Sequence, residues 1–252
     1  MTLNIEDHKL EQFDQGELEQ YLINVFRLAM LHYGLWFNEV QHQLGLEETL
    51  GIEAEVSERL VPIIMKKLAQ PLGYQVNDKG IPLSLASMPK QKLFSLVDAM
   101  SANWLATDGV WFQTVEKHRD MFTAKRCNDT CWTRFSPLEA SVIKSLPGFT
   151  KKEGLAALKE ALDFRIYARI NKFTTEWYDN ELIYRAVTCR VQYARKTKGL
   201  EDYPCKSAGS AEYESFARTI DPHIKTECIA CPPDTHPAEW ACAWRFYIPN
   251  IY

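Results

Sequence analysis

The sequence predicts an α+β fold in which N-terminal duplicated helical hairpins pack with a small antiparallel sheet near the C-terminus. Three observations support this prediction. The chain repeats part of itself at an offset of 75 residues, its pattern changes from helix-like to strand-like at Phe173, and five of its seven cysteines lie beyond that point. The composition, 46% hydrophobic and 25% charged, is typical of a folded globular protein.

The repeat places residues 34–40 on residues 109–115 and aligns Pro62 with Pro137. Both copies contain a Gly-x-Trp-Phe motif among apolar residues at helical spacing. We therefore predict one helical hairpin in each copy, with a proline opening its second helix, over residues 17–43 and 56–68 and again over 90–118 and 136–146. A stretch rich in Gly, Pro, Ser and Asn connects the copies over residues 71–89.

These patterns define the expected domains, a divergent helical repeat over residues 1–89 and a core over residues 90–252. The core begins with a helical hairpin over 90–150 and a helix over 152–171. A cysteine-bearing α/β part over 173–252 follows, in the order β-β-α-α-β-β. Its expected strands cover 173–178, 181–188, 223–230 and 240–248, and its expected helices cover 191–198 and 211–220.

The cysteines of the final third are candidate metal ligands. Cys228 and Cys231 form a Cys-x-x-Cys pair, and Cys205 and Cys242 are expected to complete a four-thiolate site from adjacent elements. Zinc and a [4Fe-4S] cluster both accept such ligands. Cys189 is a fifth candidate. The alternatives are buried free thiols, since cysteine is often buried, or a redox dithiol.

Carboxylates in the second hairpin are candidate catalytic groups. Asp108 and Glu116 are eight residues apart and therefore share one helix face, and Glu139 is expected on the neighbouring helix. Such carboxylates bind metals or move protons, although charged helix residues more often face water. Arg190 and Arg195 are candidates to hold a substrate carboxylate in a bidentate pair, and Trp111 is a third candidate for substrate binding.

Charge and hydropathy narrow the expected partners and location. With a net charge of −4, the chain lacks the basic surface that nucleic acid or an anionic membrane attracts. No apolar stretch approaches the roughly 18 residues of a membrane span, and the acidic first residues do not resemble a secretory signal. We therefore predict a cytoplasmic protein with a small-molecule ligand, no nucleic acid and no membrane partner, and we leave a homodimer open.

Five segments of the chain resemble an uncharacterised family of bacterial and archaeal cytosolic proteins. They are residues 103–112, 166–171, 189–199, 220–228 and 231–237. That family is similar, more distantly, to the L-2-amino-thiazoline-4-carboxylate hydrolases and to vinyl-reductase-type sensor domains. The resemblance implies an α/β ligand-binding fold with a cysteine-bound metal beside a buried pocket. In the sensors it implies zinc held by three cysteines and one acidic residue, which Cys205, Glu227, Cys231 and Cys242 would match here. Cys228 departs from that pattern and makes an all-cysteine site an equal alternative.

The sequence thus supports two functional hypotheses. In the first, a cysteine-ligated metal protein acts as a hydrolase or lyase on a C–N or C–S bond, with Glu227, Asp108 or Glu116 as the general base. In the second, the metal is structural and the protein is a non-catalytic sensor or carrier of a small molecule. Four thiolates saturate zinc, so a complete four-cysteine site favours the second hypothesis.

Overall fold

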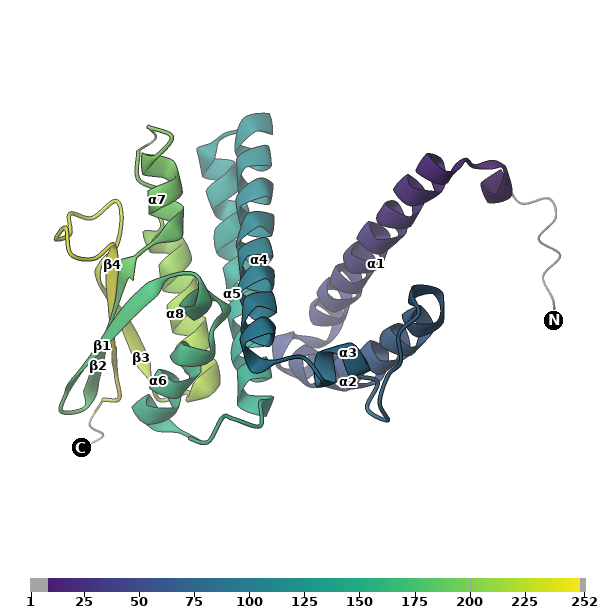
Figure 1. The fold of residues 1–252 in the computed structure, drawn as a ribbon. Helices are drawn as coiled ribbons and strands as arrows, with labels where there is room; N and C mark the ends of the chain where they lie inside the picture. The colour runs from purple at the N-terminus through teal and green to yellow at the C-terminus, as the bar shows by residue number, and fades with distance from the viewer. Residues whose placement is uncertain (1–8, 200, 250–252) are drawn as a thin grey trace. The chain divides into compact units, whose positions relative to one another are not determined.

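The computed structural model describes residues 9–199 and 201–249 and has the predicted α+β fold (Figure 1). The chain divides between Val61 and Pro62 into two compact units, which are described separately. The first unit is helical, and the sheet belongs to the second. None of the described helices combines the length and the apolar character that a membrane crossing requires.

The first unit contains the short 3-10 helix η1 (Lys9–Gln12), helix α1 (Gln15–Leu44) and most of helix α2 (Leu46–Leu72). Asp14 begins α1 in a capping box with Glu17, which satisfies two backbone amides at the helix start. A hydrogen bond of 2.8 Å from Tyr33 Oη to Glu53 Oε1 connects α1 to α2. No residue of α1 is fully buried within the described structure, and most of its apolar side chains are exposed.

The first residues of corresponding helices in the two hairpins are 75 positions apart, which is the offset of the sequence repeat. Helix α1 begins at Gln15 and helix α4 (Lys90–His118) at Lys90, while α2 begins at Leu46 and α5 (Met121–Ser145) at Met121. The prediction that a proline opens the second helix of each hairpin is wrong, because Pro62 and Pro137 lie inside α2 and α5. In α5 the true N-cap is Asp120, whose carboxylate accepts a hydrogen bond from the backbone amide of Thr123.

The expected helix over residues 152–171 is interrupted. Helix α6 (Gly154–Phe164) is followed by Arg165 in extended backbone and then by the 3-10 helix η2 (Ile166–Arg169). The guanidinium of Arg165 forms buried ion pairs with Glu139 and Glu212, so long-range contacts and not local propensity end the helix here. Between the two hairpins, the short helix α3 (Leu83–Ala86) and a β-bridge from Val76 to Pro82 occupy the predicted connector.

The sheet follows the predicted order. Strands β1 (Lys172–Tyr178) and β2 (Glu181–Thr188) form a hairpin, helices α7 (Arg190–Lys196) and α8 (Lys206–Ile220) follow, and β3 (Lys225–Ala230) and β4 (Cys242–Tyr247) complete a sheet of order β1-β2-β4-β3. All three pairings are antiparallel. The β1–β2 turn contains Asp179 with a positive φ of 44°, as tight hairpin turns require.

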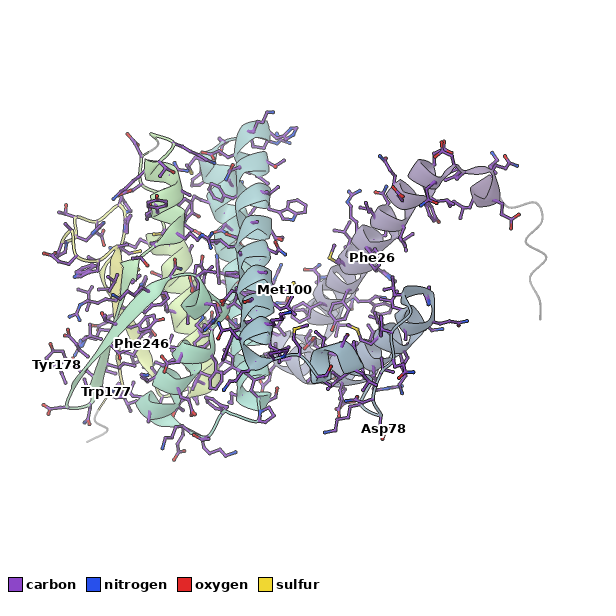
Figure 2. All side chains as sticks on the ribbon, viewed as in Figure 1. Phe26, Asp78, Met100, Trp177, Tyr178 and Phe246 are labelled. Atoms are coloured by element: carbon purple, nitrogen blue, oxygen red, sulfur yellow. The ribbon has the colours of Figure 1, made fainter. Side chains whose placement is uncertain are left out.

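The core of the second unit lies between the sheet and α8, and α5 packs on the other side of α8 (Figure 1). Trp244 and Phe246 of β4 are fully buried in it. Figure 2 shows Phe246 among these elements, while Trp177 and Tyr178 project from the tip of the β1–β2 hairpin. Trp244 lies directly over Gly209 of α8, where a Cβ atom would come within 2.6 Å of the indole ring.

Candidate ligand cavity and cysteine cluster

Four cysteines from three elements meet at one end of the sheet. Cys228 lies on β3, Cys231 follows that strand, Cys242 begins β4, and Cys205 is the N-cap residue of α8. The Sγ atoms of Cys231 and Cys205 are 3.4 Å apart, and the thiols of Cys228 and Cys242 lie close enough to raise the pKa of the Cys231 thiol. We call these four residues the cysteine cluster.

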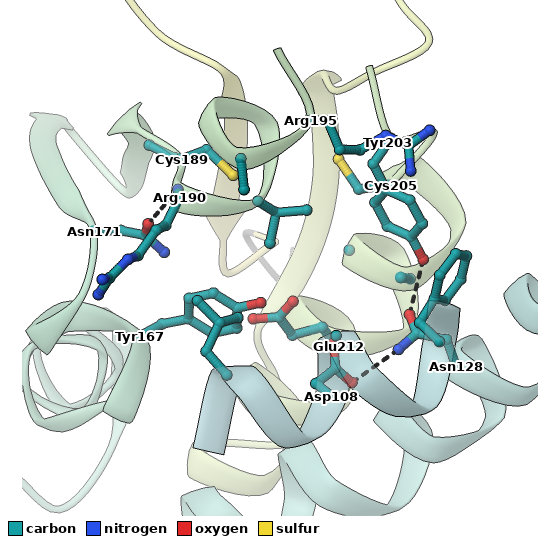
Figure 3. A pocket seen from close by; sticks show the side chains of 18 of the residues that line it. Asp108, Asn128, Tyr167, Asn171, Cys189, Arg190, Arg195, Tyr203, Cys205 and Glu212 are labelled. Carbon is teal, nitrogen blue, oxygen red and sulfur yellow. Dashed lines mark hydrogen bonds between the residues drawn. The ribbon is translucent and has the colours of Figure 1, made fainter. Parts of the chain in front are cut away.

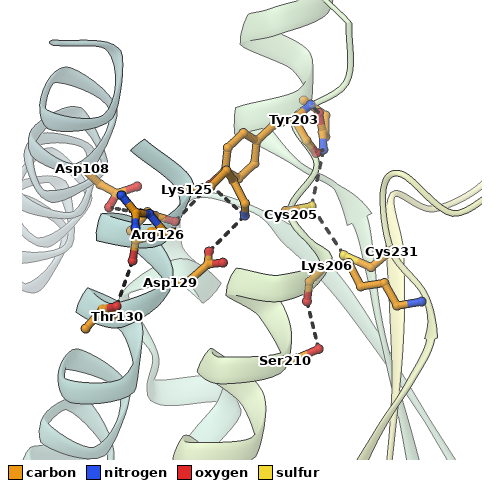
Figure 4. Close-up of polar contacts among 12 residues, drawn as sticks. Asp108, Lys125, Arg126, Asp129, Thr130, Tyr203, Cys205, Lys206, Ser210 and Cys231 are labelled. Atoms are coloured by element: carbon orange, nitrogen blue, oxygen red, sulfur yellow. Dashed lines mark hydrogen bonds and ion pairs between the residues drawn. The ribbon is translucent and has the colours of Figure 1, made fainter. Parts of the chain in front are cut away.

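Backbone and side-chain contacts hold the loop after β3 against the start of α8. The Cys231 amide donates to Asp234 Oδ2 at 3.3 Å, and that carboxylate forms an ion pair of 2.8 Å with Lys206 Nζ. The Lys206 amide in turn donates to the Pro232 carbonyl at 3.0 Å. Figure 4 shows Cys231 beside Cys205 and Lys206 at the start of α8. These contacts bring together two cysteines that are distant in the sequence.

The cluster changes the acidity of its own thiols. Hydrogen bonds from Cys231 lower the pKa of Cys205 and of Cys228, and the nearby Lys206 ammonium lowers the pKa of Cys228 further. The same hydrogen bonds raise the pKa of Cys231. Thiolates are the form that binds metals, so two thiols with lowered pKa values suit ligation. Within residues 9–199 and 201–249, no three His, Cys, Asp or Glu side chains already have the arrangement of a metal site.

The other cysteines stand apart from the cluster. Cys189 precedes α7, and burial raises the pKa of its thiol to about 12. The charges of Cys205 and Cys242 also raise the pKa of Cys189. In the described part of the chain, Cys189 forms no hydrogen bond with either of these cysteines. Cys127 and Cys131 are exposed on α5.

A cavity of about 770 Å³ lies beside the cluster, and Cys205, Cys231 and Cys242 form part of its wall. This volume falls in the range of roughly 300–1,000 Å³ that small-molecule sites occupy. Its other lining residues include three carboxylates, three cations and a set of aromatic side chains. They are Asp108, Glu116 and Glu212, then Arg190, Arg195 and Lys198, and then Phe112, Trp132, Tyr167, Phe173, Tyr203, Tyr213 and Trp244. The cavity therefore combines an aromatic surface with charges of both signs.

Asp108 of α4 is held in the cavity by a chain of hydrogen bonds (Figure 3). Asn128 Nδ2 donates to Asp108 Oδ1 at 3.1 Å, and Tyr203 Oη donates to Asn128 Oδ1 at 3.0 Å. Lys125 Nζ donates to Tyr203 Oη at 3.2 Å (Figure 4). Burial raises the pKa of Asp108, against the opposing effect of the Asn128 hydrogen bond. A carboxyl group with a fixed orientation and a raised pKa is typical of residues that transfer protons.

Glu212 is a cavity residue that sequence reasoning missed. It lies on α8, is 8% exposed, and accepts a hydrogen bond of 2.5 Å from Arg165 Nη1. The available signal was its spacing from Cys205, because residues 205, 209 and 212 share one face of a helix. The predicted helix began at residue 211, which separated Glu212 from Cys205, whereas α8 begins at Lys206.

Comparison with known proteins adds one finding. The sequence model of a family of unknown function, DUF6125, matches residues 84–248. The chain belongs to the DUF6125 family. Neither the curated proteins nor the solved structures contain a match to it. Every residue that lines the cavity and all four cysteines of the cluster lie inside the part of the chain that the DUF6125 family covers.

Three other predicted site residues of this DUF6125 protein line the cavity, namely Glu116, Arg190 and Arg195. The fold does not bring Glu227 or Trp111 there. Side chains alternate along a strand, and Glu227 faces the opposite side of β3 from Cys228, where Arg245 Nη1 and Tyr247 Oη donate to its carboxylate at 2.7 and 2.8 Å. That position removes Glu227 both as a general base and as the acidic ligand that the resemblance implies.

Trp111 is 64% exposed on α4, and its neighbours in the sequence line the cavity instead. Phe112 takes the place expected for Trp111, because one residue along a helix turns the side chain by about 100°. Glu139 also departs from the expected group of carboxylates. It is buried and paired with Arg165 rather than with Asp108.

Proposed function

We propose that this DUF6125 protein is a cysteine-ligated metal protein, with zinc or a [4Fe-4S] cluster held beside a small-molecule cavity. The observation that supports the proposal is the meeting of Cys231 with three other thiols in the wall of that cavity. Lys206 supplies a positive charge next to the cluster, which favours the thiolate forms that a metal requires.

In the catalytic form of the proposal, the protein is a hydrolase or lyase acting on a C–N or C–S bond. Bound zinc with an open position would supply Lewis acidity. Asp108 is the preferred general base, because burial raises its pKa and Asn128 fixes its orientation. Glu116 is the second choice for the base. Arg190 and Arg195 line the cavity as the residues to hold a substrate carboxylate.

The second candidate is a non-catalytic sensor or carrier with a structural metal. It is favoured by the closeness of Cys231 to Cys205, Cys228 and Cys242, since four thiolates leave zinc no position for substrate. The catalytic form instead requires that one cysteine remain outside the coordination sphere. Cys228 is the residue for that role, because it alone among the four does not line the cavity.

The test is metal analysis of protein purified without oxygen. We expect one zinc ion or one cluster per chain, and loss of most of it in Cys231→Ser. The matched control is Cys127→Ser, which changes an exposed cysteine outside the cluster and should keep the metal. Wild-type protein without metal, or a Cys231→Ser variant that retains it, would overturn the proposal.

X-ray absorption spectroscopy of the zinc-loaded protein separates the two candidates. Four sulfur ligands at about 2.3 Å indicate the structural site of a sensor or carrier. Three sulfur ligands with one lighter ligand at about 2.0–2.2 Å indicate an open site and favour the enzyme. Visible absorbance with equal amounts of iron and sulfide identifies the cluster instead of zinc.

A further inference from the structure

Helix α1 carries apolar side chains that the rest of the first unit does not cover. Among residues 9–61 as the structure describes them, Thr49 of α2 is the single fully buried residue. The hydroxyl of Tyr33 on α1 donates to Glu53 of α2, and the partly buried Phe37 lies on the same side of α1 as Tyr33. A helix that is apolar on several sides is normally packed against partners. The first unit by itself therefore leaves α1 incomplete.

The side of α1 that faces away from Tyr33 carries a heptad pattern, which we call the leucine seam. Its residues follow one another in alternating steps of three and four, and they are Tyr21, Asn24, Leu28, Leu31, Leu35 and Asn38. Because each residue turns a helix by about 100°, the three leucines lie about 140–160° around α1 from Tyr33. Leu28 and Leu35 are 61% and 65% exposed. Such a pattern is typical of helices that pair in a coiled coil.

The leucine seam suits a second copy of α1 better than a charged partner. With Glu17 and His42 added at its ends it extends over nearly four heptads, and about three to four heptads are enough for a coiled coil. Arg27 is the one residue between positions 20 and 38 that is charged at neutral pH, so the seam offers no acidic or basic patch. Leucines lie at the middle of the seam and polar residues towards both ends. A pattern that is alike in both directions is self-complementary, as a two-fold symmetric dimer requires.

We propose that α1 pairs with the same helix of a second copy of this chain through the leucine seam, in antiparallel orientation. Leu28 then meets the partner's Leu31, and Glu17 meets the partner's His42 at each end of the seam. A parallel pairing would instead place the two Glu17 carboxylates side by side, where like charges repel. The seam lies outside residues 84–248, which the DUF6125 family covers, and the inference depends on neither the metal nor the cavity.

The first experiment is sedimentation velocity on the full wild-type chain. A reductant is present, so that the exposed Cys127 and Cys131 form no disulfide between copies. We expect a reversible dimer at concentrations up to about 100 μM, a range in which interfaces of moderate affinity associate. This measurement does not depend on the folding of any variant. A wild-type protein that stays monomeric at about 100 μM would overturn the inference and assign the seam to a different partner.

Leu28→Glu places a carboxylate at the centre of the seam and should weaken the dimer by at least about tenfold, because the charge would be buried between helices without a partner. The matched control is Leu22→Glu, the same substitution on the Tyr33 side of the same helix at a position that is 54% exposed, and it should keep the dimer. Far-ultraviolet circular dichroism of the same samples checks that both variants keep their helices. A dimer that persists in Leu28→Glu, or equal weakening by the two changes, would contradict the seam.

Two double variants test the orientation. Leu28→Lys/Leu31→Glu brings opposite charges together across an antiparallel pair, whereas Leu28→Lys/Leu31→Lys brings like charges together there. We expect the first to dimerise at least about tenfold more tightly than the second. Similar dimerisation by the two would contradict the antiparallel pairing. Metal content of the same samples should not change, so failure of this inference and failure of the proposed metal site are separate results.

Discussion

The Sγ atoms of Cys205 and Cys231 lie 3.4 Å apart, although 26 positions separate the two residues in the sequence. One caps α8 and the other follows β3, so the contact links a helix to the sheet. The loop between Cys231 and Asp234 is fastened to Lys206 through the Asp234 carboxylate, which helps to bring the two sulfurs together. The cluster is therefore part of the fold as well as a candidate metal site.

The fifth cysteine should be dispensable for metal binding. We expect Cys189→Ser to retain its metal and Cys242→Ser to lose most of it, because Cys242 affects the pKa of the Cys231 thiol directly and Cys189 is not among the groups that do. Zinc ligation contributes on the order of 10 kcal/mol to the folding of small structural sites. The Cys242→Ser variant should therefore also unfold at a lower temperature. Metal per chain and thermal unfolding measure both effects, and equal metal loss in the two variants would contradict the prediction.

Asp108→Asn should stabilise the protein at neutral pH. The folded-state pKa of Asp108 is raised by burial, so the wild-type protein loses stability as pH rises from the ordinary carboxyl pKa of about 3.9 through the raised value. Asparagine carries no charge and avoids this loss. The gain should exceed the roughly 0.5 kcal/mol typical of surface substitutions and should vanish at acid pH.

Urea unfolding at a series of pH values measures this gain. The control is Asp98→Asn, on the exposed part of the same helix, where the carboxylate pairs with Arg169. That change should be neutral or cost up to about 1 kcal/mol. If Asp108→Asn is no more stable than wild type at neutral pH, Asp108 is not a strained cavity residue.

Arg165→Met should destabilise the second unit by about 3–5 kcal/mol at neutral pH, because it leaves the carboxylates of Glu139 and Glu212 buried without their cation. Burial raises the pKa of Glu212, so the loss should shrink as pH falls and Glu212 takes up a proton that removes part of the uncompensated charge. Arg218→Met removes an exposed arginine from α8 and should cost less than about 1 kcal/mol. A loss that does not depend on pH would indicate packing alone.

Gly209→Ala should destabilise the protein by about 1–3 kcal/mol, because the new Cβ would lie 2.6 Å from the Trp244 ring and would force the indole to move. Gly109→Ala is the matched control, a helical glycine of the same unit whose Cβ would meet nothing closer than 3.8 Å. It should stabilise α4 by up to about 1 kcal/mol. Chemical unfolding followed by near-ultraviolet circular dichroism compares them, and a stable Gly209→Ala protein would contradict the packing.

The sequence by itself determined the fold class and the strands. The aromatic and β-branched residues of β2 and the Asp179–Asn180 turn are local signals, so the strand Glu181–Thr188 begins and ends where the pattern predicts. The start of α4 at Lys90 was predicted for the same reason. The grouping of Cys205, Cys228, Cys231 and Cys242 followed from their spacing and the order of the elements.

The tertiary structure decided which charged groups reach the cavity. Arg165 ends a helix because two distant carboxylates bind it, and Glu212 enters the cavity because α8 extends back to Lys206. Glu227 and Trp111 face away from the cavity, whereas their sequence neighbours Cys228 and Phe112 face the cysteine cluster and the cavity. Local sequence fixes the period of a strand or helix, whereas the burial of one face depends on contacts between residues far apart in the chain.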